Sequence, residues 1–283
     1  MGMPAASATE ERRLRRGLKS RHLQMIAIGG AIGTGLFLGS GGTISQAGPG
    51  GALLAYAAIG IMVLFVMQSL GEMSTHLPVA GSFHTYGTKY VSPSFGFAMG
   101  WNYWFNWAIT LAAELVAAGV IMSFWFPDVP SWIWAAVFLI LLAGLNFLSA
   151  KAFGEGEFWF AAIKVTAVLA FLVLGVLMIF GILGGTSPGM SNWTTGEAPF
   201  VGGWMSVISV FMIAGFSFQG TELVGVTAGE SENPRKDMPR AIRTVFWRIM
   251  LFYIGAIAVI GFLLPYTDPS LLASANNEDI TAS

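Results

Sequence analysis

Seven apolar segments follow one another along the chain, separated by short polar or Pro- and Gly-containing joints. These segments, spans 1 to 7, occupy residues 22–44, 50–77, 96–126, 131–150, 157–184, 200–228 and 245–266. As a helix rising 1.5 Å per residue, each can cross a hydrocarbon core of roughly 30 Å. Only 10% of the 283 residues are charged, against roughly a quarter in a soluble domain. The pattern predicts an all-α polytopic membrane protein and excludes an ordinary soluble enzyme.

Positive charge is unevenly distributed among the joints. All Lys and Arg residues except Lys164 fall in three regions that we place on one side of the membrane. These are residues 1–21, the joints that contain Lys89 and Lys151, and the segment from Arg235 to Arg248. The alternate segments 127–131, 185–199 and 267–283 contain neither residue type. Because Lys and Arg accumulate on the cytoplasmic side of membrane proteins, residues 1–21 are predicted to be a cytoplasmic tail and residues 267–283 an external stretch. Pro234 and Pro239 argue against a long helix through the charged joint 229–243.

The chain lacks the side chains that many catalytic sites require. It has no Cys, and its three His residues (His22, His76 and His84) have no metal-ligand spacing. No Ser/His/Asp arrangement is recognisable either. We therefore expect no enzyme activity, no cofactor, no metal ion and no nucleic-acid partner.

Spans 1 and 6 are both interrupted by glycine. Residues 29–35 contain four Gly residues, and residues 215–222 combine Gly215 and Gly220 with Ser217 and Gln219. Glycine costs up to about 1 kcal/mol relative to alanine inside a helix. Close packing through small residues would explain one such run. Two runs, in spans 1 and 6, are what inverted repeats of five helices predict, and paired interruptions of this kind indicate a transporter binding site.

A broken helix suggests the kind of substrate. Backbone N–H and C=O groups freed in mid-membrane need partners, and a zwitterion supplies both. Its carboxylate suits the N–H groups at the start of a half-helix, where the dipole is positive. The sequence therefore predicts a receptor for an amino acid backbone, with Gly33, Thr34, Gly35 and the segment 216–220 as its walls.

Three ionisable residues within the spans, Glu114, Lys164 and Glu222, are functional candidates because charge inside a bilayer is costly. Glu114 shares a helix face with Tyr103 and Trp107, which suits a cationic side chain. The alternative is an aromatic packing stripe with a protonated acid. Lys164 and Glu222 are candidates for proton coupling, and we favour Glu222 for substrate binding because it adjoins the interruption. The structural alternative for Lys164 is a tether to carbonyl groups of the broken helix.

Several blocks of sequence resemble the amino acid–polyamine–organocation superfamily, and more narrowly its bacterial amino acid permease branch. The blocks are Ile28–Phe37, Ser45–Gly51, Leu70–Glu72, Pro78–Phe83, Gly100–Trp104, Gly220–Leu223 and Ala228–Pro234. Further blocks are similar to the lysine-specific members: Phe153–Phe160, Asn192–Phe200, Phe216–Gln219 and Pro265–Leu272.

This resemblance implies a leucine-transporter-like fold of twelve helices with inverted five-helix repeats and alternating access. Residues 22–184 would form the first repeat, residues 200–266 would begin the second, and we expect the chain to be incomplete after Ser283. By motif position, Gly33, Thr34 and Gly35 correspond to the substrate carboxylate site. Phe216 corresponds to the aromatic gate over the substrate. Ser217, Gln219 and Gly220, in the same segment, are expected to bind the substrate. Glu114 would line the side-chain subsite, Glu222 matches the span 6 acid, and Lys164 matches a lysine of proton-coupled relatives.

The leading hypothesis is an importer of L-lysine with protons in the bacterial inner membrane, surrounded by the lipid bilayer. A permease for another amino acid, such as arginine, histidine or an aromatic one, is the first alternative. A permease that doubles as a lysine sensor for a membrane-embedded regulatory partner is the second.

Overall fold

The computed structural model describes residues 25, 29–30, 32–79, 81–147, 150–227 and 233–271. The predicted tail 1–21 and most of the predicted external stretch lie outside the described residues. Within the described part the chain is helical and contains no strand, so the all-α prediction is confirmed.

The first half of the chain forms α2 (Thr34–Phe37), α3 (Gly39–His76), α4 (Ser82–Tyr90), α5 (Pro93–Trp125), α6 (Ser131–Asn146) and α7 (Ala150–Ile179). The second half forms α8 (Ser191–Thr194), α9 (Gly203–Ser209), α10 (Phe211–Ser217), α11 (Leu223–Val226), α12 (Pro234–Arg248), the π-helix η2 (Ile249–Ile254) and α13 (Gly255–Leu263).

Spans 2 and 3 each lie almost entirely within one long helix, α3 and α5. In span 4 the helix α6 ends at Asn146, and in span 5 α7 ends at Ile179 rather than at residue 184. Span 2 joins span 1 within α3 at Gly48, whose φ of +75° is one that glycine adopts without strain, and Pro49 then opens span 2. By length and composition, four described helices can cross a membrane: Gly39–His76, Pro93–Trp125, Glu155–Ile179 and Arg235–Leu263. Spans 1 and 6 instead consist of shorter helical pieces, which agrees with the interruptions predicted from their glycines.

The prediction for the start of span 7 is wrong. A helix runs through the charged joint as α12, which begins at Pro234 and contains Pro239. Proline is well tolerated at the first helical position because the N–H it lacks would have no partner there. Pro239 lies in the second turn and is exposed, so the hydrogen bond that it removes lies near the water-accessible end of the helix.

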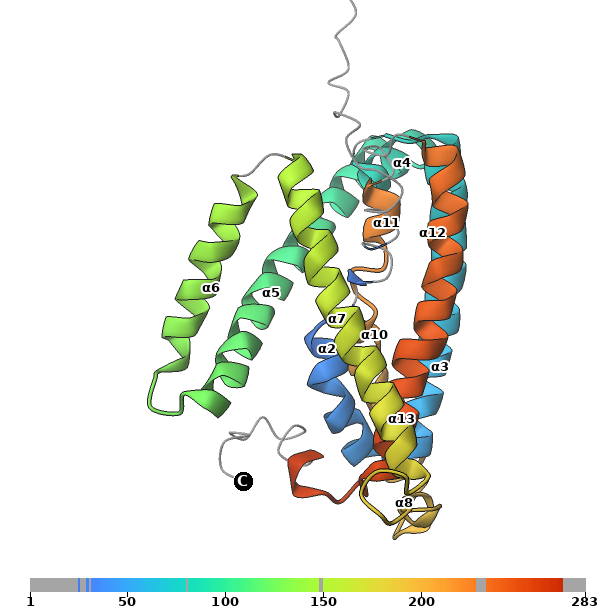
Figure 1. The fold of residues 1–283 in the computed structure, drawn as a ribbon. Helices are drawn as coiled ribbons and strands as arrows, with labels where there is room; N and C mark the ends of the chain where they lie inside the picture. Colours follow the sequence, from blue (N-terminus) through green and yellow to red (C-terminus); the bar gives the residue numbers. More distant parts are fainter. Residues whose placement is uncertain are drawn as a thin grey trace, which may run out of the picture.

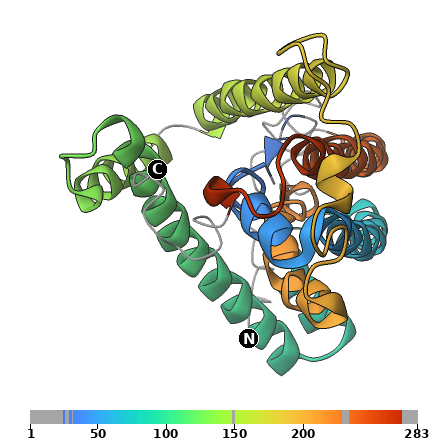
Figure 2. The ribbon, with the colours of Figure 1, turned by 90° about the horizontal axis from the view of Figure 1, so that it is seen from below.

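The helices alternate in direction around the two broken spans (Figure 1). The path through α2 into the first part of α3 runs downward in this view, before α3 turns at Gly48 and runs upward. The path through α9, α10 and α11 runs upward beside α2. Seen from below, the residues of span 1 lie centrally, and α5 and α6 extend away from the other helices (Figure 2). No residue of α6, which is described in full, is buried.

The core lies where α3, α10 and α12–α13 meet around the broken spans. Its largest fully buried apolar side chains belong to Ile32, Ile44, Tyr56, Met67, Val168, Val207, Met238, Tyr253 and Ile257. The breaks are therefore held by the best-packed part of the molecule, which gives them a defined geometry.

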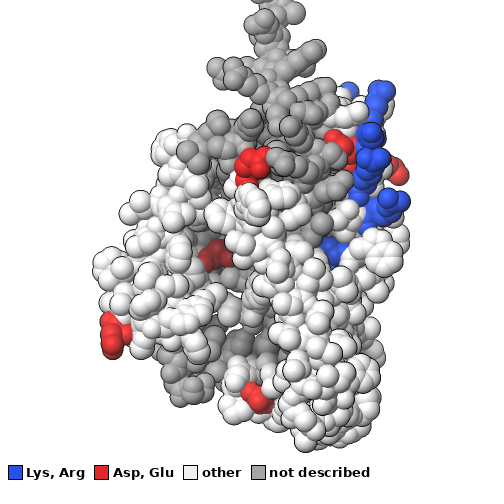
Figure 3. Space-filling model, in the orientation of Figure 1, with Lys and Arg blue, Asp and Glu red and all other residues white. Residues whose placement is uncertain are grey.

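Described Lys and Arg side chains gather at the upper end of the molecule, over α12 (Figure 3). This asymmetry has the same sense as the sequence prediction, which placed that end in the cytoplasm. Arg248 departs from the prediction, because it lies inside the molecule with 2% of its surface exposed. The prediction that Arg248 lies with the cations of the charged joint is therefore wrong. Its position falls within span 7, which was predicted to begin at residue 245.

Candidate functional site

The break in span 1 lies just before α2. Gly33 has an extended backbone, with φ −148° and ψ −159°, and α2 begins at Thr34. The Leu38 N–H donates to the Thr34 carbonyl at 2.8 Å, so α2 continues directly into α3. Backbone N–H groups in the first turn of a helix have no acceptor within that helix. The N–H groups of Thr34 and Gly35 therefore lie at the break, at the start of α2.

The break in span 6 lies between α10 and α11. Residues 218–222 form turns, and Gly220 has a φ of +89°, which explains why glycine occupies this position. The Glu222 carboxylate accepts a hydrogen bond from the Gly220 N–H at 2.9 Å. Glu222 therefore stabilises the turn that forms the break.

The two breaks touch each other at Gly35 and Ser217. A methyl group placed on Gly35 would lie 2.5 Å from Ser217 Cα. This close approach brings segments about 180 residues apart in the sequence to one site, as the paired glycine runs predict.

A cavity of about 190 Å³ lies between the breaks, α5 and α7. It is lined by Gly30, Ile32, Gly33, Gly35, Trp107, Thr110, Glu114, Lys164, Phe216, Ser217 and Gln219. Eight of these residues were predicted to belong to the site: Gly33, Gly35, Trp107, Glu114, Lys164, Phe216, Ser217 and Gln219. We refer to this space as the central cavity.

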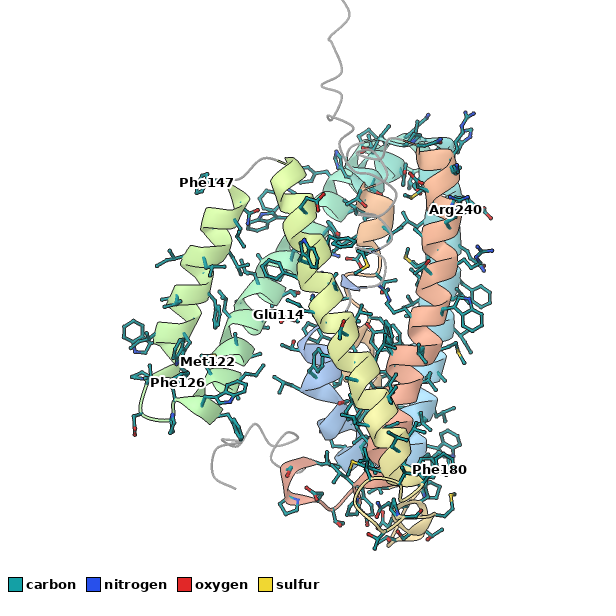
Figure 4. All side chains as sticks on the ribbon, viewed as in Figure 1. Glu114, Met122, Phe126, Phe147, Phe180 and Arg240 are labelled. Carbon is teal, nitrogen blue, oxygen red and sulfur yellow. The ribbon has the colours of Figure 1, made fainter. Side chains whose placement is uncertain are left out.

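Glu114 supplies the carboxylate of the central cavity. It lies near the middle of α5, on the side that faces α2 and α7 (Figure 4). Its Oε1 accepts a hydrogen bond from the Thr34 hydroxyl at 2.8 Å. Thr34, which does not line the cavity itself, thus orients the acid that does.

Lys164 reaches the same cavity from α7. Its Nζ donates to the carbonyl oxygens of Gly29 at 3.3 Å and Ile32 at 3.2 Å. These carbonyls belong to the interrupted part of span 1, so the contacts are those of the structural alternative, a tether. The same contacts place a positive charge beside the break and next to the central cavity.

Glu222 and Tyr103 lie in a neighbouring cavity of about 360 Å³. The Tyr103 hydroxyl donates to Glu222 Oε1 at 3.3 Å. Gln219 lines both cavities, and its side-chain amide hydrogen-bonds the Thr110 hydroxyl, with contacts of 2.7 and 3.0 Å. Of the two acids, Glu114 is therefore the one that faces the space between the breaks.

The aromatic residues that share a face of α5 with Glu114 do not all line the same cavity. Tyr103 and Trp107 contact edge to face at 6.3 Å between ring centroids. Trp107 and Glu114 line the central cavity, whereas Tyr103 lines its neighbour. The predicted helix face of Tyr103, Trp107 and Glu114 therefore borders two neighbouring cavities.

Sequence reasoning missed four residues around the breaks, namely Tyr56, Thr110, Arg248 and Tyr253. Each has a polar group within an apolar span, and that pattern is the signal that could have identified them. Tyr56 and Tyr253 are fully buried and hydrogen-bonded to Ser217. Among the residues that the structure describes, no cluster of His, Asp and Glu could hold a metal ion.

Comparison with known proteins gives consistent matches along almost the whole chain. The family model described as amino acid permease matches residues 22–282. The lysine-specific permease LysP of Escherichia coli (strain K12) is 62% identical over 276 residues, 97% of this chain and 56% of that protein. LysP of Lactococcus lactis (strain MG1363) is 54% identical over 274 residues, 95% of this chain and 54% of that protein.

Histidine permease HisP of the same Lactococcus strain is 56% identical over 263 residues, 93% of this chain and 55% of that protein. The chain spans about half the length of the curated relatives it matches. A permease named for histidine is thus as similar to this chain as one of the two named for lysine.

Proposed function

This chain belongs to the amino acid permease family, and on that premise we propose that it imports L-lysine together with protons by alternating access. One observation carries the proposal. Two broken helices meet around a cavity whose wall contains one carboxylate, one ammonium group and the backbone of both breaks.

The backbone of the substrate would bind at the breaks. The first-turn N–H groups of Thr34 and Gly35 suit a carboxylate, because they carry the positive end of the helix dipole. The α-ammonium group would donate hydrogen bonds to carbonyl oxygens of the turn after Ser217. Phe216, which is 38% exposed, lines the cavity from α10 and would cover the bound substrate as a gate.

The side chain of lysine would extend toward Glu114. Its ammonium group would pair with the carboxylate that Thr34 orients, next to the ring of Trp107. A charge-assisted hydrogen bond in such a half-buried position contributes roughly 1.5–3 kcal/mol. This pairing favours a cationic amino acid over a neutral one of the same size.

Proton coupling would involve the ionisable residues beside the breaks, Glu114, Lys164 and Glu222. Each contacts a backbone or side-chain group of a broken span. A change in the position of either half-helix would change those contacts, and with them the affinity of the group for a proton. Protonation and the conformational change would thereby be linked.

We further propose that residues 22–184 form a first repeat and residues 200–266 begin an inverted second one, with residues 267–283 outside the cell. The opposite directions of spans 1 and 6 support this assignment. The gathering of Lys and Arg over α12 supports a cytoplasmic N-terminus in a bacterial inner membrane.

The test is uptake of radiolabelled L-lysine by the full-length protein in proteoliposomes, with and without an inward proton gradient. We expect gradient-driven accumulation that unlabelled lysine blocks and phenylalanine does not. Sodium at fixed pH should have no effect. Stimulation by sodium alone would overturn the proton coupling, and accumulation of a different amino acid would overturn the substrate.

Histidine is the second candidate substrate, because a histidine permease is 56% identical to this chain. Glu114 would pair with an imidazolium ion as well as with an ammonium ion. Competition at two pH values separates the candidates, since imidazole is largely protonated only below its pKa of about 6.5. Histidine should compete with lysine at both pH values in a histidine permease. In a lysine permease that accepts histidine only as an imidazolium ion, it should compete only at the lower pH.

A further inference from the structure

The break in span 6 leaves a backbone carbonyl without its usual helical partner. In a continuous helix, the Ser217 carbonyl would accept from the Thr221 N–H. In this structure the Thr221 N–H lies 3.3 Å from the Phe218 carbonyl instead. Ser217 is buried, so its carbonyl needs another donor.

Tyr253 of span 7 supplies that donor. Its hydroxyl donates to the Ser217 carbonyl at 2.9 Å, and the tyrosine is fully buried. Its ring stacks on Phe218, with 4.3 Å between the ring centroids. Tyr253 therefore contacts the break through both a hydrogen bond and a ring.

Arg248 binds the other side of the same break. Its Nη2 donates to the Thr221 hydroxyl at 2.7 Å, and that hydroxyl donates to the Phe218 carbonyl at 2.6 Å. A buried guanidinium is costly unless it is hydrogen-bonded, and the Thr221 hydroxyl at the break accepts one of its hydrogen bonds.

The π-helix η2 explains how two residues of one helix reach both sides of the break. Arg248 immediately precedes η2, and Tyr253 lies within it, five residues later. In an α-helix, neighbours on one face are three or four residues apart. A π-helical turn bonds residues five apart, so it brings this pair toward a common face.

Tyr56 of span 2 completes the contacts with Ser217. Its hydroxyl lies 2.9 Å from Ser217 Oγ and 3.4 Å from the Gly35 carbonyl. Tyr56 is thus in contact with both broken spans where they touch, and its ring lies 6.0 Å from that of Phe218.

We propose that Tyr253, Arg248 and Tyr56 are positioning residues, which hold residues 216–221 in the conformation that binds substrate. They do not line the central cavity, whereas Phe216, Ser217 and Gln219 do. The proposal depends on the proposed function only where lysine binding is measured. The positioning role itself is that two hydrogen bonds from span 7 hold the break in span 6.

The principal test is Tyr253→Phe in the full-length protein, with Tyr90→Phe as the control. Both substitutions remove one hydroxyl group, but Tyr90 is exposed. Losing a donor to a buried carbonyl is expected to raise the lysine Kd about 10-fold, whereas Tyr90→Phe should leave Kd unchanged. A variant with wild-type Kd, or one whose Tm falls while Kd stays constant, would show that Tyr253 is merely structural.

Hydrogen–deuterium exchange tests the same proposal without substrate. Tyr253→Phe should accelerate exchange of the amides in residues 218–222 and leave those in α5 unchanged. If the wild-type protein does not bind lysine, the proposed function fails while this measurement still decides the positioning role. Tyr56→Phe is the second variant should Tyr253→Phe not fold, and unchanged exchange in whichever variant folds would overturn the proposal.

Discussion

In the proposed function, Glu114 is the residue that selects the charge of the substrate side chain. We predict that Glu114→Gln raises the KM for lysine by roughly 10-fold to 100-fold, because a charge-assisted hydrogen bond contributes about 1.5–3 kcal/mol. The measurement is initial uptake in proteoliposomes as a function of lysine concentration. Glu72→Gln is the matched control, because Glu72 is exposed and lies near the C-terminal end of α3, outside the central cavity.

The same substitution at Glu222 separates the two acids. Glu222 caps the Gly220 N–H and accepts from Tyr103 in the neighbouring cavity. Glu222→Gln is therefore expected to lower the maximal uptake rate strongly with a smaller effect on KM. A larger KM effect at Glu222 than at Glu114 would contradict the assignment of Glu114 to the side-chain subsite.

The hydrogen bonds from Lys164 to the carbonyl oxygens of broken span 1 can be tested by a single substitution. Lys164→Met removes the ammonium group that donates to the Gly29 and Ile32 carbonyls. We expect binding of lysine to weaken at least about 10-fold, since two buried carbonyls lose a charged donor. Binding is measured by scintillation proximity with purified protein, and wild-type affinity in the variant would contradict the role of the tether.

At the scale of elements, the contact between the two broken helices makes Gly35 irreplaceable. Gly35→Ala would force Cβ against the backbone of Ser217, with 2.5 Å to its Cα. Overpacking of this kind costs about 1–3 kcal/mol, so we expect a lower Tm and little uptake. Gly215→Ala in α10 is the control, because no atom lies within 4 Å of the added methyl group, and its Tm should match or exceed that of the wild type. Equal Tm values for both variants would argue against the close approach.

The breaks could be predicted from sequence because glycine acts locally. The four glycines in residues 29–35 and the glycine with positive φ at position 220 each lie within the span that they interrupt. The partners of the breaks could not be predicted in the same way. Tyr56, Arg248 and Tyr253 act across packing between spans, and a single polar group in an apolar span does not say which break it meets. The error at Pro234 and Pro239 has a related cause, since the cost of proline depends on where the helix begins.

At the scale of the whole molecule, charge and topology lead to one orientation. The Lys and Arg side chains of α12 gather at one end of the described part (Figure 3). The joint 181–190 between α7 and α8 lies at the opposite end (Figure 1). Because α7 and α12–α13 are both long enough to span a membrane, the two joints are predicted to lie on opposite sides of it, with α12 beginning in the cytoplasm.

Cysteine labelling can check this orientation in whole cells, because the chain contains no Cys of its own. Thr186 and Lys236 are both exposed and lie in the two opposite regions. We expect Thr186→Cys to react with a membrane-impermeant maleimide in intact cells, and Lys236→Cys to react only after permeabilisation. The reverse pattern would mean that the N-terminus faces outward and that the orientation inferred from the positive-inside rule is wrong. Labelling of both positions in intact cells would contradict α7 and α12–α13 as membrane-crossing segments.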